Sequence, residues 1–255
     1  MHNPRLVYAG NRRIGIEGLK LFLQSDWKPS VLILPKGKSA EFTDDMKALV
    51  PDIPVLEGVE FRSARGVKKL KSLNPDYILS VHFPYLIPPE VLGIPVIGTL
   101  NLHPAFLPYN RGWHTPSWAI YDCTPYGATL HWVDEGIDTG DIAMQREMEV
   151  SPDDTAHSLY QRVLRLEIEL LREAIPFMSS RSLLRSPQAS GGSSHRKEEL
   201  QSIQLLGLAK EKPIGEILKI LRALTTNRWN EAAFFEVDGL RYRVRIEIRE
   251  EKGDL

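Results

Sequence analysis

The chain has 255 residues, of which 42% are hydrophobic and 25% charged, so it is long enough for one sizeable core and a small appendage. Its formal net charge of -1 provides no overall field that would attract nucleic acid or an anionic membrane. The single cysteine excludes an internal disulfide, and we find neither a signal peptide nor an apolar run of roughly 20 residues, so we expect a soluble cytoplasmic protein without a membrane partner.

Short apolar runs alternate with amphipathic stretches over the first hundred residues. The runs predicted to be strands are residues 5–10, 31–35, 54–58, 76–83 and 95–103, and helical patterns lie around residues 14–25, 41–49 and 61–73. Strands separated by helices are typical of a parallel sheet, because each parallel connection must cross over the sheet. The sequence therefore predicts an α/β fold with a mostly parallel, Rossmann-like sheet and helices on both of its faces.

The second half of the chain predicts two more strands, a long helix and a small C-terminal domain. An acidic turn joins the strands, residues 126–134 and 142–150, and Thr155 is placed to cap a helix that runs to about Phe177. Beyond a Ser-, Gly- and Pro-rich stretch we expect a helix and a β-hairpin that turns at Asp238-Gly239. The expected domains are a main domain over 1–178, a linker over 179–197 and a small helix-hairpin domain over 198–255.

Asn101 and His103 stand at the end of a predicted strand. Because strand side chains alternate, both polar groups face one side of the sheet and their leucine neighbours face the other. Pro104 cannot continue an inner ladder, and ligands of open α/β sheets bind at the carboxyl ends of strands. Histidine can act as a general base and asparagine can donate a hydrogen bond to a developing oxyanion, so the pair suits attack on a carbonyl-type carbon.

A histidine in this role needs a partner that fixes its tautomer, and the acidic turn DEGIDTGD can provide one. Its carboxylates belong to Asp134, Glu135, Asp138 and Asp141, and spacing alone does not choose among them. The competing interpretation is that His103 is only a hydrogen-bonded residue at a strand end and that the turn is a solvated loop.

Other chemistries fit the sequence less well. The glycines of YAGNRRIGIEG, at positions 10, 15 and 18, lack the spacing that brings a helix N-terminus to a dinucleotide pyrophosphate, and no P-loop motif is present. The histidines show no zinc-binding spacing such as H-E-x-x-H. We therefore expect no metal and no dinucleotide cofactor.

Two segments resemble the signature of the folate-dependent formyltransferases: NLHPAFLPYNRG, which begins at Asn101, and GATLHWVDEGIDTGDI, which begins at Gly127. That family includes methionyl-tRNA formyltransferase, glycinamide ribonucleotide transformylase and the sugar N-formyltransferases, and the similarity in pattern covers residues 5–178. The resemblance implies the formyltransferase fold, N10-formyltetrahydrofolate as the formyl donor, and Asn101, His103 and Asp138 as the catalytic trio.

The resemblance also implies where the donor binds and which branch of the family the chain is most similar to. The residues expected to bind the pterin are Leu86, Ile87, Ile97, Asp134, Glu135, Gly136 and Ile137. The tRNA enzymes typically have SLLPRWRG where this chain has AFLPYNRG, and the 12 basic and 11 acidic residues of 196–255 are too balanced for a tRNA clamp. The opening AGNRRIG and the C-terminal region instead resemble those of the sugar N-formyltransferases.

The sugar branch implies a nucleotide-linked amino sugar as acceptor. Aromatic rings in the loop could stack on a sugar or a base, and Arg12, Arg13 and Arg111 could meet the diphosphate. The residues expected to bind the acceptor are Asn11, Arg12, Tyr109, Asn110, Arg111 and Trp113. The alternatives are that Trp113 packs into its own loop and that Arg12 is a solvated charge at a helix start.

The C-terminal region is expected to form a homodimer, because the hairpin has an apolar face that one helix can hardly cover. That face consists of Tyr242, Val244, Ile246 and Ile248. The alternative is that this face folds back on its own catalytic domain. Two other functions remain open, a methionyl-tRNA formyltransferase and a non-catalytic protein that binds folate or a sugar nucleotide.

Overall fold

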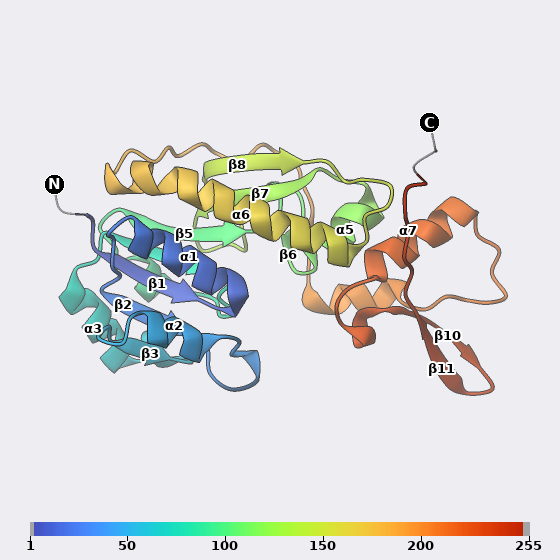
Figure 1. Cartoon of the computed structure of the whole chain (residues 1–255), viewed down its shortest axis with the longest axis horizontal. Coiled ribbons are helices and arrows are strands. Elements are labelled where there is room, and N and C mark those ends of the chain that lie inside the picture. The colour runs from blue at the N-terminus through green and yellow to red at the C-terminus, as the bar shows by residue number, and fades with distance from the viewer. Residues whose placement is uncertain (1–2, 252–255) are drawn as a thin grey trace. The chain divides into compact units, whose positions relative to one another are not determined.

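The computed structural model describes residues 3–251 and contains a seven-stranded sheet, whose strands and helices are drawn in Figure 1. The strands are β1 (Leu6–Gly10), β2 (Val31–Leu34), β3 (Val55–Glu57), β4 (Tyr77–Val81), β5 (Gly98–His103), β7 (Tyr126–Trp132) and β8 (Ile142–Met148). Their order is β3-β2-β1-β4-β5-β7-β8. The first five strands pair in parallel and β7 runs antiparallel to β5, so the predicted α/β sheet is confirmed.

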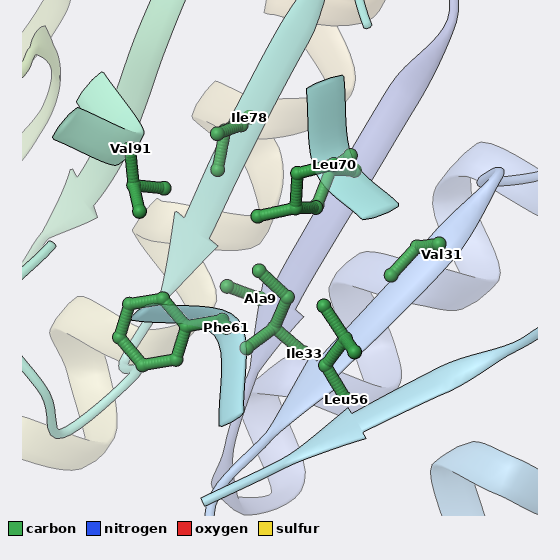
Figure 2. Close-up of a cluster of buried hydrophobic side chains, with 9 residues drawn as sticks. Ala9, Val31, Ile33, Leu56, Phe61, Leu70, Ile78 and Val91 are labelled. Carbon is green, nitrogen blue, oxygen red and sulfur yellow. The ribbon is translucent and has the colours of Figure 1, made fainter. Parts of the chain in front are cut away.

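Both faces of the sheet are covered, which explains why its central strands are apolar throughout. The helices are α1 (Arg12–Gln24), α2 (Thr43–Leu49), α3 (Ala64–Leu73), α4 (Pro89–Leu92), α5 (Thr115–Asp122), α6 (Ala156–Ser179) and α7 (Ile214–Leu224). On one face, Ala9 of β1 packs in a cluster with Leu70 of α3 and Val91 of α4 (Figure 2). On the other, the Tyr8 ring meets Phe22 of α1 edge to face.

The chain divides into two compact units, and each is assembled from three separate segments. The first unit comprises the chain up to His103, Thr129–Gln145 and Leu166–Gln188. The second comprises Pro104–Ala128, Arg146–Arg165 and the chain from Ala189 onward. The sequence-based boundaries at residues 178 and 197 stay a prediction.

The second unit has a small core of its own. Trp118 of α5, Leu224 of α7 and Ala233 of β10 are buried together in it. Short helical turns and strand pairs complete this unit: β6 (Arg111–Gly112), β9 (Ser194–His195), β10 (Ala233–Val237), β11 (Leu240–Val244), and the 3-10 turns Lys197–Ile203 and Trp229–Glu231. The first unit contains two further 3-10 turns, Gly37–Ser39 and Glu60–Arg62.

Two sequence predictions about the C-terminal half can be compared with the structure directly. Thr155 caps α6 as expected, since its hydroxyl accepts from the Ser158 amide at 3.3 Å. The hairpin turns at Asp238-Gly239, where both residues have positive φ, but its second strand ends at Val244. Ile246 therefore lies beyond the ladder, and its amide bonds to the Thr225 hydroxyl at 3.2 Å.

No helix among residues 3–251 is both long and apolar enough to cross a membrane.

Candidate active site

The site is built on the last residues of β5. Asn101 pairs with His131 of β7 and His103 pairs with Thr129, in an antiparallel register that ends at Pro104. His103 is buried and Asn101 is half-buried. The strand therefore delivers both polar side chains to the carboxyl edge of the sheet, as their alternation predicted.

The loop between β7 and β8 carries Asp138, and hydrogen bonds within the first unit hold that loop rigid. The Asp134 carboxylate accepts from the Gly136 amide at 3.0 Å and from the Thr139 hydroxyl at 2.7 Å. The Gln188 side-chain amide donates to the carbonyls of Asp138 and Gly140 at 2.8 and 2.7 Å. Asp138 has a φ of 53°, a strained value for a residue with a side chain, which these bonds maintain.

Asn101, His103 and Asp138 meet at this point. The Asp138 carboxylate lies 3.6 Å from His103 Nε2 through one oxygen and 3.5 Å from Asn101 Nδ2 through the other. Its side chain is only 14% exposed, so little water screens these interactions. The structure thus brings together the three residues that the sequence proposed. Of the two aspartates, Asp138 contacts His103 and Asn101, whereas Asp134 bonds within its own loop.

His131 is a fourth member of this cluster, and the sequence did not identify it. Its Nδ1 lies 2.8 Å from the carbonyl of Trp132, which can only accept, so Nδ1 carries a hydrogen. Its Nε2 lies 3.2 Å from Asn101 Nδ2 and 3.4 Å from the Asp138 carboxylate, so His131 contacts two members of the trio. The antiparallel register opposite Asn101 is the signal that places it there.

A second buried pair stands near the end of β4 and was also missed. His82 has a φ of 51°, and its Nε2 lies 3.0 and 2.9 Å from the two carboxylate oxygens of Glu167 on α6. Glu167 is fully buried. The pair fastens α6 to the start of the loop that carries Leu86, so it positions that loop.

The residues expected to bind the donor fall into two groups. Leu86 and Ile137 are large apolar side chains that remain 72% and 54% exposed. Ile87 instead packs against the buried cluster under the sheet, and the carbonyl of Ile97 accepts from Arg185 at 2.9 Å. The remaining donor candidates, Asp134, Glu135 and Gly136, are exposed positions of the β7–β8 loop.

The two acceptor candidates of the first unit, Asn11 and Arg12, differ in burial and in the contacts that they make. Asn11 is buried, and its amide donates to the Ser39 carbonyl and accepts from the Glu41 amide, each at 3.0 Å. Asn11 therefore braces the loop after β2. Arg12 is partly exposed, has a φ of 62° and lies 3.6 Å from the Glu41 carboxylate.

The acceptor candidates of the second unit lie on one loop. Asn110 is buried, and its amide donates to the Thr124 hydroxyl at 3.0 Å. Tyr109 and Arg111 are half-buried, whereas Trp113 is 45% exposed, which excludes the interpretation that it packs into its loop core. Burial lowers the pKa of the neighbouring His114, an effect that the Glu231 carboxylate opposes in part.

Among residues 3–251, no group of three or more His, Cys, Asp or Glu side chains could hold a metal ion.

Comparison with known proteins decides the family. Residues 35–175, more than half of the chain, match the formyl transferase family, and residues 199–250 match the N-formyltransferase dimerization C-terminal domain. The chain belongs to the formyl transferase family. It is an enzyme of the formyltransferase type and is most similar to the sugar N-formyltransferases.

Relatives of this formyl transferase family member include enzymes with different acceptors. A dTDP-4-amino-4,6-dideoxyglucose formyltransferase from Mycobacterium bovis is 32% identical over 177 residues, covering 69% of this chain and 75% of that enzyme. A methionyl-tRNA formyltransferase from Geobacter sulfurreducens is 34% identical over 196 residues, 74% of this chain and 62% of that enzyme.

A solved N-formyltransferase from Helicobacter canadensis, in complex with folinic acid and dTDP-3-aminofucose, shares the fold. It has a TM-score of 0.71 and 21% identity, and the alignment covers 92% of this chain and 85% of that one. The formyltransferase fold that the sequence implied is therefore confirmed.

Proposed function

We propose that this enzyme transfers a formyl group from N10-formyltetrahydrofolate to the amino group of a nucleotide-linked amino sugar, for synthesis of a surface polysaccharide of the O-antigen type. The observation that carries the proposal is the meeting of Asn101, His103 and Asp138 within 3.6 Å at the carboxyl edge of the sheet. Its place of action is the cytoplasm, where the folate donor and nucleotide sugars occur together.

Each member of the trio has a distinct task in this reaction. The acceptor amine attacks the formyl carbon, and negative charge develops on the formyl oxygen. The bond between the formyl carbon and N10 then breaks, so that tetrahydrofolate leaves with a proton on N10 while the amine loses one. Asn101 donates an amide hydrogen to that oxygen, and His103 stabilises it from the same edge of the strand. Asp138 orients the His103 ring or a water that carries away the amine proton.

Two exposed apolar side chains of the first unit fit the flat pteridine of the donor. Leu86 and Ile137 stand in solvent on two loops of the first unit, although large apolar groups are usually buried. Folinic acid, a relative of the proposed donor, is bound in the Helicobacter canadensis structure. We therefore propose that these two side chains hold the donor ring, while backbone groups of residues 134–138 read its polar edge.

The dimerization match at residues 199–250 and a group of exposed apolar side chains support a homodimer. Ile214 is 71% exposed and Leu218, on the same helix α7, also faces solvent. Tyr242 of the hairpin is a further large apolar side chain that is 46% exposed. Light scattering on the intact chain should give twice the 28.9 kDa monomer mass, and a monomer mass at tens of micromolar would contradict the dimer.

The rival acceptor is methionyl-tRNA, since tRNA formyltransferases also match the chain. The test supplies N10-formyltetrahydrofolate and compares dTDP-, UDP- and GDP-linked amino sugars with charged initiator tRNA. Formylation of a sugar nucleotide supports the proposal. Formylation of the tRNA alone favours the rival, and turnover of none of these amines would contradict the proposed acceptor.

A further inference from the structure

Residues 189–197, which the sequence assigns to a linker, form a ladder with the loop that carries Trp113. β9 pairs in parallel with β6, with Arg111 opposite Ser194 and Gly112 opposite His195. The amides of Arg111 and Trp113 donate to the carbonyls of Ser193 and His195 at 2.9 and 3.0 Å. The ladder therefore holds the backbone of the loop from outside, in addition to the turn in which the Tyr109 amide donates to the Phe106 carbonyl.

Two glycines make this ladder possible. A Cβ on Gly112 would lie 2.4 Å from the His195 carbonyl oxygen, and one on Gly192 would lie 2.1 Å from the Pro108 carbonyl oxygen. Both glycines have a φ of 90°, a conformation that residues with side chains rarely adopt. The two segments approach as closely as backbone can, so their relative position is fixed.

One face of the ladder packs inward. The His195 ring stacks on Trp118 at 4.0 Å with an interplanar angle of 6°, and its Nε2 lies 3.0 Å from the Asp122 carboxylate. Away from His195, the side chains of Trp113, Arg196 and Lys197 are exposed. We call Trp113, Arg196 and Lys197 the ladder face.

The side chains of Trp113, Arg196 and Lys197 are exposed, although backbone hydrogen bonds hold the ladder itself. The Lys197 ammonium lies 5.1 Å from the centre of the exposed Trp113 ring. The backbone of Lys197 is also hydrogen-bonded by the His114 side chain. Within the described part of the chain, Arg196 and Lys197 form no ion pair, so their positive charges are not neutralised.

We propose that the ladder face binds the nucleoside diphosphate part of the acceptor. The Trp113 indole stacks on the base, and Arg196 and Lys197 meet the diphosphate. An exposed aromatic ring beside two cations without an ion pair matches a ligand that joins a flat base to a dianionic group. This inference rests on the proposed function and assigns it two residues, Arg196 and Lys197, outside the loop recognised from sequence.

The test measures nucleotide binding without the chemistry. dTDP, UDP and GDP are titrated separately by calorimetry into the full-length chain in the absence of donor. One of them should bind, and Trp113→Ala should weaken its binding about 5-fold to 100-fold, the usual range for loss of a stacked base. Lys197→Ala should weaken it about 10-fold, as expected for loss of a charge-assisted contact.

A matched control is present in the same unit. Lys219 on α7 lies 5.3 Å from the centre of the Tyr121 ring, so Lys219→Ala removes a similar lysine-aromatic contact away from the ladder. Nucleotide affinity should be unchanged in this variant. Trp113→Phe keeps a stacking ring and should restore most of the affinity lost in Trp113→Ala, which separates loss of stacking from loss of fold.

Three results would overturn the inference: wild-type affinity in Lys197→Ala, equal binding of pyrophosphate and the nucleotides, or no binding of any of the three nucleotides at millimolar concentration. Failure of the proposed function would look different. If a nucleotide binds and depends on Lys197, but no amino sugar is formylated, then the ladder face stands and the sugar acceptor is wrong.

Discussion

The trio at the end of β5 and the ladder face are held in opposite ways. At the trio, side chains hold one another: the Asp138 carboxylate reaches both His103 and Asn101, and all three groups are largely buried. At the ladder, backbone bonds do the holding and the side chains of Trp113 and Lys197 stay in solvent. We infer that the difference reflects two proposed tasks: groups proposed to act on the reacting atom are preorganised by their neighbours, whereas groups proposed to bind the nucleotide need only a rigid backbone beneath them.

The largest effect should come from removing one member of the trio. His103→Asn should lower turnover by about 10²-fold to 10⁴-fold, the usual loss for a positioned acid or base, because Asn cannot exchange a proton. Steady-state assays with saturating donor and acceptor give kcat, and circular dichroism checks that the variant folds. A variant with the wild-type kcat would remove His103 from the mechanism.

The second effect tests whether the trio depends on its supports. Gln188→Ala removes the two hydrogen bonds to the carbonyls of Asp138 and Gly140, so Asp138 should lose its fixed position and kcat should fall about 10-fold to 100-fold. The control is Gln204→Ala, which removes a similar bridge to the carbonyls of Asn230 and Ala232 in the second unit. It should lower Tm without lowering kcat. Equal kcat losses in both variants would show that only stability had changed.

Sequence reasoning succeeded where a pattern is local. The alternation around Asn101 and His103 predicts their common face, and the apolar runs predict the strands of the sheet, because both follow from the geometry of one extended segment. Gln188 and β9 could not be found this way. Gln188 bonds to the loop that carries Asp138, 50 residues earlier in the chain, and the β9 segment bonds to the loop that carries Asn110, 83 residues earlier. Both lie in a stretch whose composition resembles a linker.

The same limit applies to His131 and Asn11. His131 is an ordinary strand residue until the antiparallel register sets it opposite Asn101. Asn11 was expected to touch the acceptor, yet both ends of its amide are occupied by Ser39 and Glu41. Its role in acceptor binding stays a prediction. Because Asn11 braces the loop after β2, it would affect the acceptor through the position of that loop.

A third, smaller effect is the dependence of acceptor affinity on salt concentration, which tests how many cations of the ladder face meet the acceptor. A few cations that meet one diphosphate release few counterions, so acceptor affinity should fall about 10-fold or less between about 50 mM and about 200 mM salt. A protein that neutralises six to ten phosphates would lose about 10³-fold to 10⁵-fold over that range. A steep loss, measured by calorimetry across the salt series, would indicate a nucleic-acid acceptor.

The smallest effect is on stability, at the residue that anchors Lys197. Burial lowers the pKa of His114 below its ordinary value of 6.5, so the unfolded chain binds a proton more readily than the folded one. Stability from this residue is complete above about pH 6.5 and should fall as the pH drops below it. His114→Asn, which tolerates the positive φ of this position, should reduce that slope in urea unfolding series. An identical slope in the variant would show that other groups cause it.

The position of Gln188 late in the chain has a further consequence during synthesis. Asn101, His103 and Asp138 are all synthesised before Gln188, which holds the loop that carries Asp138, since proteins emerge from the N-terminus. A nascent chain that ends before Gln188 would already contain the whole trio and would lack the two hydrogen bonds to the carbonyls of Asp138 and Gly140. We expect such unfinished chains to turn over the formyl donor at least as slowly as Gln188→Ala, so that full activity begins only when synthesis has passed Gln188.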